Sequence, residues 1–207
     1  MATPRNTSSR SARLSKALIK MGSTAAIILA AGASLRLGTP KQLVRLGGET
    51  LLERTVRIAL EAGLNPVLGV VPPDLRIEPS PSGMTRIVNP LAVEGMATSI
   101  GTGLRALAAS VSISGAIILA CDQPAVTARH LRELAHGAGE IVASAYSGRK
   151  GIPAYFPSAI FQALLALRGD LGARDLIQNA RAVPLPGGDL DVDTIEDLDR
   201  ARKLYTP

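Results

Sequence analysis

The feature that most constrains this chain is a series of short, continuous apolar runs separated by segments of helical periodicity. Three such runs, without a charged or polar side chain, are residues 25–30, 67–71 and 116–120. A β-strand covered on both faces has this composition, because neither of its sides meets water. Strands of this kind in alternation with helices predict an α/β fold: a Rossmann-like, doubly wound, mainly parallel sheet in three α/β/α layers.

The other expected elements continue this alternation. Further strands are predicted at residues 86–88, 140–145, 154–156 and 182–185. Helices are predicted at residues 51–62, 96–109, 130–135 and 160–167, with one more after Asp170 and a last one from Thr194. Ligands of such sheets bind beyond the carboxyl ends of the strands. We therefore expect the chemically active side chains directly after the strands at 25–30 and 116–120.

The charge of the chain is concentrated near its beginning. The net charge is +6, but residues 1–20 carry five basic side chains and no acidic one. The remaining 18 of the 23 basic residues face 17 acidic ones. We interpret residues 1–20 as a basic, disordered and dispensable leader and residues 21–207 as a single, nearly neutral domain. The leader is a targeting peptide, a basic arm or, as we favour, upstream sequence read through from a misassigned start codon before Met21.

Composition disfavours several classes of function. Aromatic residues make up 2% of the chain and Trp is absent, which argues against the stacking platforms of single-stranded nucleic-acid binders. No apolar run approaches the roughly 18 residues that suggest a membrane span. Cys121 is the only cysteine, so the chain has no internal disulfide and no cysteine-rich metal site. We therefore expect a cytoplasmic protein that binds neither nucleic acid nor membrane.

The loop after the first strand has the composition of a phosphate-binding loop. In residues 29–41, LAAGASLRLGTPK, small side chains let the backbone pass close to a ligand, and successive N–H groups can form an anion cradle. Arg36 can hold phosphate oxygens through two parallel hydrogen bonds, and Lys41 supplies a mobile point charge. The segment lacks the Gly-Lys-Ser/Thr of a Walker A loop. The alternative interpretation is an ordinary strand-to-helix turn with two surface cations.

Aspartates at two places in the chain are candidate metal ligands. Asp122 follows the strand at 116–120, where a carboxylate can hold Mg²⁺ against a triphosphate. The alternative for Asp122 is a turn-forming residue. Asp191 and Asp193 are two residues apart, so both point to one side of an extended segment. Asp193 can complete the coordination sphere, or it can merely favour the start of the helix that follows it.

The loop at residues 29–41 resembles the signature loop of the MobA-like nucleotidyltransferases. Within that family the chain is most similar to the molybdenum cofactor cytidylyltransferases. The likeness covers residues 25–204 through a series of later blocks: Asn89-Pro90, Gly95-Met96, Ser99-Ile100, Gly103-Leu104, Asp122-Gln123-Pro124, Gly169-Asp170, Gly172-Ala173-Arg174 and Asp191-Val192-Asp193-Thr194. One block differs, because relatives often have Gly-His-Pro where this chain has Gly151-Ile152-Pro153. This difference concerns the acceptor more than the chemistry.

The resemblance implies roles for particular residues of this chain. The catalytic ones are Arg36, Lys41 and Asp122, and Asp122 with Asp193 would hold Mg²⁺. The nucleotide would contact the first loop and two later blocks, at Leu29, Ala30, Ala31, Gly32, Arg36, Lys41, Asn89 and Ser99. For the last two residues the alternatives are a turn cap and a simple helix-start residue. The acceptor would contact Gly151, Asp170 and Arg174.

The implied reaction is transfer of CMP from CTP to the phosphate of molybdenum cofactor, with release of pyrophosphate. CTP is favoured over GTP because the loop reads Leu-Ala-Ala-Gly, whereas guanylyl-transferring relatives typically have Leu-Ala-Gly-Gly. The partners would be CTP or another nucleoside triphosphate, a molybdopterin-type acceptor, and a molybdoenzyme or its chaperone. The alternatives are transfer to a sugar or polyol phosphate, guanylyl transfer to the same cofactor, and a non-catalytic carrier of the cofactor.

Overall fold

The computed structural model describes residues 23–32, 34, 36–108, 113–137, 139–169 and 173–205, so the predicted leader lies outside the described residues. Its centre is a seven-stranded sheet in the order β5-β4-β1-β6-β8-β7-β9. These strands are β1 (Ser23–Leu29), β4 (Val67–Val71), β5 (Met84–Val88), β6 (Ile113–Ala120), β7 (Val142–Tyr146), β8 (Arg149–Pro157) and β9 (Arg181–Pro184). β8 runs antiparallel to β6 and β7, and the other pairs of this sheet are parallel. The expected mainly parallel α/β sheet is confirmed.

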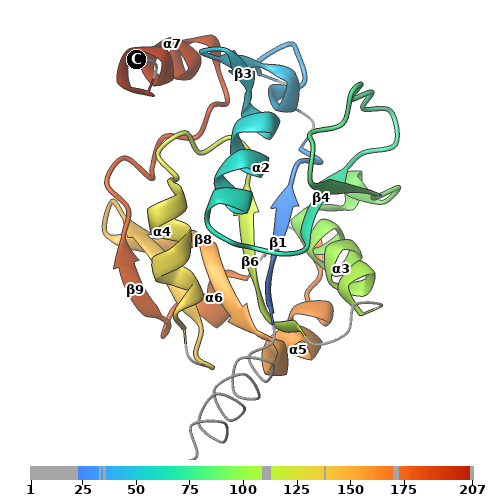
Figure 1. The fold of residues 1–207 in the computed structure, drawn as a ribbon, viewed down its shortest axis with the longest axis vertical. Helices are drawn as coiled ribbons and strands as arrows, with labels where there is room; N and C mark the ends of the chain where they lie inside the picture. Colours follow the sequence, from blue (N-terminus) through green and yellow to red (C-terminus); the bar gives the residue numbers. More distant parts are fainter. Residues whose placement is uncertain are drawn as a thin grey trace, which may run out of the picture.

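Helices cover both faces of the sheet, which gives the expected three layers (Figure 1). One face is covered by α2 (Leu51–Glu61) and α4 (Ala128–Ala135). The other face is covered by α3 (Met96–Leu107), α5 (Phe161–Leu165) and α6 (Arg174–Ile177).

A small additional unit lies at one end of the sheet. There α7 (Ile195–Tyr205) contacts a separate hairpin made of β2 (Arg45–Leu46) and β3 (Glu49–Thr50). Short 3₁₀ turns occur at Lys41–Leu43, Ala92–Glu94 and Ser158–Ile160.

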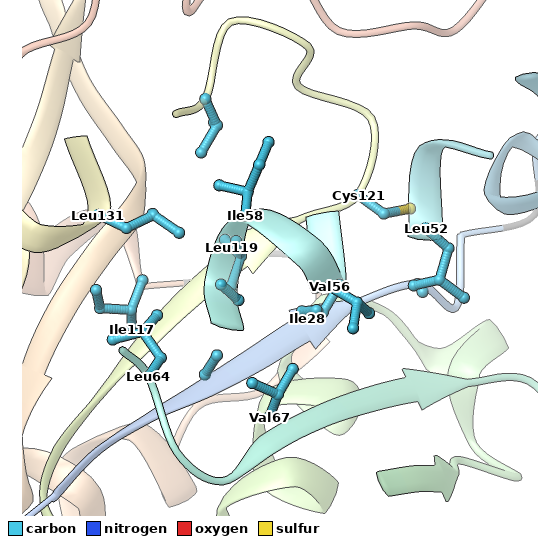
Figure 2. Close-up of a cluster of buried hydrophobic side chains, with 14 of the residues drawn as sticks. Ile28, Leu52, Val56, Ile58, Leu64, Val67, Ile117, Leu119, Cys121 and Leu131 are labelled. Atoms are coloured by element: carbon cyan, nitrogen blue, oxygen red, sulfur yellow. The ribbon is translucent and has the colours of Figure 1, made fainter. Parts of the chain in front are cut away.

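Side chains of the central strands alternate between two cores. In β1, Ala26 and Ile28 belong to the core beneath α2, whereas Ala25 and Ile27 belong to the core beneath α3. Figure 2 shows the first core, in which α2, α4 and the strands β1 and β6 contribute Leu52, Val56, Leu131, Ile28, Ile117 and Leu119. Both faces of these strands are buried along their central residues, so the side chains there are apolar, which explains the continuous runs in the sequence. Ser23 and Ser114, near the strand starts, are exposed.

A third, smaller core joins segments that are far apart in the sequence. Leu37 and Val44 come from the loop after β1, and they are joined by Leu46 and Leu51. The segment after β9 and the helix α7 contribute Leu190, Val192, Leu198 and Ala201. Val192 also donates its N–H to the carbonyl oxygen of Asp122 at 2.9 Å. The third core therefore holds the loop after β1 against the segment after β9, beside the end of β6.

The predicted elements differ from the observed ones mainly at their ends. The helix predicted at 96–109 ends at Leu107, and the strand predicted at 140–145 spans Val142–Tyr146. The helix predicted at 160–167 is divided into a 3₁₀ turn and the five residues of α5. The prediction missed the β2–β3 hairpin, because strands of two residues are too short to show a period. Within the described ranges, no helix is both long and apolar enough to cross a membrane.

Candidate functional site

The loop after β1 is shaped by hydrogen bonds to its own backbone. The buried Gln42 amide donates to the carbonyl oxygens of Ala30 at 2.6 Å and of Gly32 at 3.2 Å. Ser34 has a positive φ of 51°, and its hydroxyl oxygen accepts a hydrogen bond from the Lys41 N–H at 2.9 Å. These bonds fix the backbone from which the Lys41 side chain extends to the end of β6.

Four charged side chains meet at this edge of the sheet. The Lys41 Nζ lies 2.5 Å from Asp122 Oδ2 and 2.7 Å from Asp193 Oδ1. The other carboxylate oxygen of Asp193 accepts a hydrogen bond from Arg36 Nη2 at 2.6 Å. The Lys41 and Asp122 side chains are 14% and 13% exposed, whereas Asp193 is 32% and Arg36 is 70% exposed. Lys41 and Asp122 are therefore largely removed from water, and Arg36 binds the cluster from the solvent side.

Neighbouring charges shift the pKa values in this cluster. Burial opposes the charge of Lys41, but Asp122 and Asp193 together outweigh burial and raise the pKa of this lysine above its usual value. The hydrogen bond from Lys41 lowers the pKa of Asp193. Asp191 behaves differently, because burial and then the nearby charge of Asp122 raise its pKa to about 6. Asp191 therefore takes up a proton in mildly acid solution.

A pocket of about 590 Å³ opens beside the charged cluster. Its walls come from the loop after β1, from the segment after β4, from the start of α3 and from the end of β6. No side chain caps the start of α3 at Gly95, and the free N–H groups of a helix N-terminus favour an anion. The volume lies within the range of small-ligand pockets, which is about 300–1,000 Å³.

Asp122 has the properties of a metal ligand. Its Oδ2 is bound by Lys41, but its Oδ1 is buried and finds no hydrogen-bond partner in the described part of the chain. A buried acceptor without a partner is unfavourable, and Mg²⁺ prefers carboxylate oxygens of this kind. No group of three or more His, Cys, Asp and Glu that could hold a metal occurs among the residues described. The site fits a divalent cation held by Asp122 and Asp193, with water and substrate phosphates as its other ligands.

The structure brings most of the predicted nucleotide residues to one pocket, but not all of them. Those that line it are Leu29, Ala30, Ala31, Gly32, Lys41 and Ser99. Arg36 lies outside the lining and reaches the site only through Asp193. Asn89 also lies outside the lining, and its buried amide donates to Thr98 and Ser99 and accepts from the Leu91 N–H. Asn89 thus caps the turn before α3, and its contact with a nucleotide stays a prediction.

One predicted acceptor residue lies at an irregularity between β7 and β8. The pairing shifts here, because Ala143 is opposite Ala154 while Ser144 is opposite Gly151. At Gly151 a Cβ would collide with the hydroxyl of Tyr146. That hydroxyl donates to the Ile152 carbonyl oxygen at 3.1 Å, which also accepts from the Gln123 amide at 3.3 Å. Gln123 directly follows Asp122, so this bulge is tied to the charged cluster.

The remaining predicted residues have separate positions. Arg174 is exposed at the start of α6, and Asp170 lies outside the described residues. Asp193 binds Lys41, but its N–H also donates to Asp197 Oδ2 at 3.3 Å. The Thr194 hydroxyl accepts from the Asp197 N–H at 3.2 Å, so the segment also caps α7. The two interpretations of this segment are compatible, because one uses the Asp193 side chain and the other its backbone.

The sequence pattern of the MobA-like NTP transferase domain matches residues 26–183 of the chain. This chain belongs to the MobA-like NTP transferase family. The match includes the loop after β1, Asp122 and the β7–β8 bulge. Asp193 lies beyond the matched segment, where the third core returns the chain to the site.

Relatives of this MobA-like protein include curated proteins and solved structures. It is 32% identical over 198 residues to the purine catabolism protein PucB of Bacillus subtilis (strain 168), spanning 87% of this chain and 96% of PucB. It is 32% identical over 137 residues to a probable molybdenum cofactor guanylyltransferase of Opitutus terrae, spanning 64% of this chain and 66% of that protein.

The crystal structure of Rv0371c from Mycobacterium tuberculosis H37Rv is 28% identical with a TM-score of 0.72, covering 88% of this chain and 98% of that one. A manganese complex of Rv0371c superposes with a TM-score of 0.67. The chain is a nucleotidyltransferase of the MobA-like type.

Sequence reasoning missed three polar residues at the site of this MobA-like chain. Gln42 shapes the loop after β1, and its position directly after Lys41 was the available signal. Asp74 lines the pocket after β4, at the edge where ligands of such sheets bind. Gln123 is buried, and its Oε1 has no hydrogen-bond partner in the described part of the protein. No periodic pattern marks these three residues, because Asp74 and Gln123 lie in loops and Gln42 lies in a 3₁₀ turn of three residues.

Proposed function

We propose that this protein transfers CMP from CTP to the phosphate of molybdenum cofactor and releases pyrophosphate. The observation that carries the proposal is the position of Lys41 between Asp122 and Asp193, beside a pocket of about 590 Å³. A triphosphate needs both a cationic side chain and carboxylates that hold a metal, and here they share one edge of the sheet. Support for the acceptor comes from the relative named as a probable molybdenum cofactor guanylyltransferase.

The reaction is an in-line substitution at the α-phosphorus of CTP. An oxygen of the acceptor's phosphate forms the new P–O bond, while the bond from the α-phosphorus to the bridging oxygen of the β-phosphate breaks. Pyrophosphate leaves with that electron pair. The acceptor phosphate is already ionised, so the protein needs no general base and acts by positioning the reactants and stabilising charge.

The residues of the site divide this work. Residues 30–32 and the start of α3 line the pocket. Because the Ala30 N–H is bound to the Val70 carbonyl oxygen at 2.9 Å, the N–H groups of Ala31, Gly32 and the start of α3 are those that would bind phosphate oxygens. Lys41 and Arg36 would hold the leaving β- and γ-phosphates. Asp122 and Asp193 would hold Mg²⁺, which supplies neutralisation of the charge that develops on the phosphates. The relative solved as a manganese complex supports a divalent metal.

Two pocket residues bear on the choice of base. Ala31 lines the pocket and carries a methyl group where guanylyl-transferring relatives typically have glycine, which favours the smaller pyrimidine. Asp74 lines the same pocket, where its carboxylate would meet the base. A carboxylate accepts a hydrogen bond from the amino group of cytosine, and uracil has no such donor. We therefore expect CTP to be preferred over both GTP and UTP.

The decisive experiment measures pyrophosphate release with Mg²⁺ and each of CTP, GTP, ATP and UTP, with and without molybdenum-loaded molybdopterin. Release that requires the pterin and is fastest with CTP would support the proposal. Pterin-dependent release that is fastest with GTP would support guanylyl transfer to the same cofactor, the activity in the name of the Opitutus terrae relative. A folded protein that releases no pyrophosphate with the pterin would contradict both and direct the search to sugar or polyol phosphates, and then to a carrier role.

A further inference from the structure

Lys41 has two tasks that compete for the same ammonium group. In this structure Nζ binds one oxygen of Asp122 and one of Asp193, at 2.5 and 2.7 Å. The proposed function requires these two carboxylates to hold a metal and requires Lys41 to hold phosphates. A cation that bound the same two oxygens would lie where Nζ lies now. The lysine and a metal would therefore exclude each other at these two oxygens.

We propose that Lys41 is an internal substitute for the metal ion, and that the protein therefore takes up the divalent metal together with the nucleoside triphosphate rather than before it. This inference rests on the proposed metal-dependent nucleotidyl transfer and deepens it, because it makes the metal–triphosphate complex the true substrate. The phosphates would attract Lys41 away from the carboxylates, and Asp122 and Asp193 would then be available to hold the metal.

The charges of the cluster support this exchange. Asp122 and Asp193 are balanced by Lys41 and Arg36 in this structure. If Lys41 left alone, a buried carboxylate would lose its partner, which is strongly unfavourable. If a metal arrived alone, it would meet the charge of Lys41, and of the four oxygens of Asp122 and Asp193 only Asp122 Oδ1 would be without a partner among the described residues. Each step is unfavourable by itself, so the two are coupled.

The path of the side chain allows the exchange without a backbone movement. The Lys41 stem passes over Gly32, where a Cβ would lie 3.6 Å from Lys41 Cε. Both residues line the nucleotide pocket. Rotations about the side-chain bonds of a lysine can therefore carry Nζ from the carboxylates toward phosphates held in this pocket.

Binding of Mn²⁺ to nucleotide-free protein, followed by electron paramagnetic resonance, tests the inference. We expect Lys41→Met to bind Mn²⁺ at least tenfold more tightly than the wild type, because the competing cation is gone. The matched control is Lys203→Met, which removes an exposed lysine from α7 and should bind Mn²⁺ as the wild type does. Equal or weaker Mn²⁺ binding by Lys41→Met would overturn the inference.

A second measurement covers the case in which Lys41→Met is too unstable to titrate. Lys41→Gln keeps a polar side chain without the charge, and its melting temperature should rise more with Mn²⁺ than that of the wild type. In the wild type, CTP should tighten Mn²⁺ binding at least tenfold after correction for the metal bound by free CTP. A melting temperature that Mn²⁺ raises equally in both proteins, or wild-type Mn²⁺ binding that CTP leaves unchanged, would overturn the inference.

These readouts are independent of the acceptor. Tighter Mn²⁺ binding by Lys41→Met together with no pyrophosphate release from any acceptor would contradict the proposed function and leave the exchange standing. If the wild type releases pyrophosphate as proposed, but Lys41→Met binds Mn²⁺ no more tightly than the wild type, the exchange alone would be contradicted.

Discussion

Single side chains decide the chemistry at this site, and Asp122 is held there by two different parts of the protein. The Val192 N–H binds its carbonyl oxygen, Lys41 binds its Oδ2, and its buried Oδ1 is without a partner among the described residues. The backbone hydrogen bond fixes the position of Asp122, and its free Oδ1 would be available to bind a metal. A substitution that keeps the shape and removes the charge therefore isolates its chemical role.

We expect Asp122→Asn to lower kcat for pyrophosphate release at least about 100-fold, because loss of metal-supplied charge stabilisation costs several kcal/mol. The measurement is steady-state pyrophosphate release at saturating CTP, with circular dichroism to show that the variant is folded. A folded Asp122→Asn or Asp122→Ala enzyme of near-normal rate would contradict the assignment of this residue.

Asp191 should oppose stability at neutral pH. Its pKa is raised to about 6 in the folded protein, compared with about 3.9 in an unfolded chain. The folded state therefore binds the extra proton between these values, and the stabilising contribution of Asp191 is full below about pH 4 and lost as the pH rises through 6. We expect Asp191→Asn to raise the melting temperature at pH 7 and to have little effect at pH 4. An unchanged or lower melting temperature at pH 7 would contradict this.

At the residue scale, the sequence predicted where in the fold the active side chains lie, but not which of them form ion pairs with each other. Asp122 and Lys41 were found because each follows a buried strand, and ligands bind at that edge. The contact between Lys41 and Asp193 spans 152 positions of the sequence. It depends on the third core, and no local pattern encodes the packing of residues so far apart.

Among the elements, the bulge between β7 and β8 is held by side chains that replace strand pairing. The Ser144 hydroxyl donates to the Pro153 carbonyl oxygen at 2.6 Å, and His130 Nε2 lies 2.7 Å from the same hydroxyl. Tyr146 and Gln123 bind the neighbouring carbonyl oxygen of Ile152. Both carbonyl groups freed by the register shift are therefore satisfied, which fixes the shape of the predicted acceptor side.

The buried His130 should make stability depend on pH. Burial lowers its pKa below the usual value of about 6.5. The unfolded chain therefore binds the proton more readily, so the contribution of His130 is full above about pH 6.5 and is lost as the pH falls below it. We expect His130→Leu to lower the free energy of unfolding at pH 7 by about 1–3 kcal/mol, the cost of a lost buried hydrogen bond. The variant should also flatten the decline in stability between pH 7 and 5.

Urea unfolding at pH 5, 6 and 7 measures both effects of the His130 change. The matched control is His136→Leu, which replaces the exposed histidine at the end of the same helix. A His130→Leu protein with the pH profile of the wild type would contradict the role of burial.

The elements themselves were predictable from the sequence wherever burial imposes a period. Cys121 directly follows the buried strand β6, and its thiol lies in the core beneath α2, where burial raises its pKa. The bulge was not predicted, because the strand was expected only at residues 154–156, whereas β8 begins at Arg149 and its register shifts between Gly151 and Ala154. A register shift is a property of two strands, and a single strand does not reveal it.

For the molecule as a whole, charge separates the predicted leader from the folded domain. Without residues 1–20 the net charge falls from +6 to +1, so the basic character belongs to the leader. We expect a chain that begins at Met21 to release pyrophosphate and to bind CTP as the full chain does. Its binding to polynucleotides should also be the same as that of the full chain. Filter binding to single-stranded DNA and the pyrophosphate assay compare the two chains. A loss of polynucleotide binding on deletion would revive the basic-arm interpretation.

The third core has a consequence for the order in which the protein becomes active during its synthesis. The ribosome makes every strand of the sheet before it makes Asp193, since β9 ends at Pro184. A nascent chain can thus pair β1, β4 and β6 and enclose much of the pocket while Lys41 still lacks one of its two carboxylates. Only when Leu190 and Val192 pack against the loop after β1 are all four charged groups assembled. Emergence of the segment after β9 is therefore the event that completes the site.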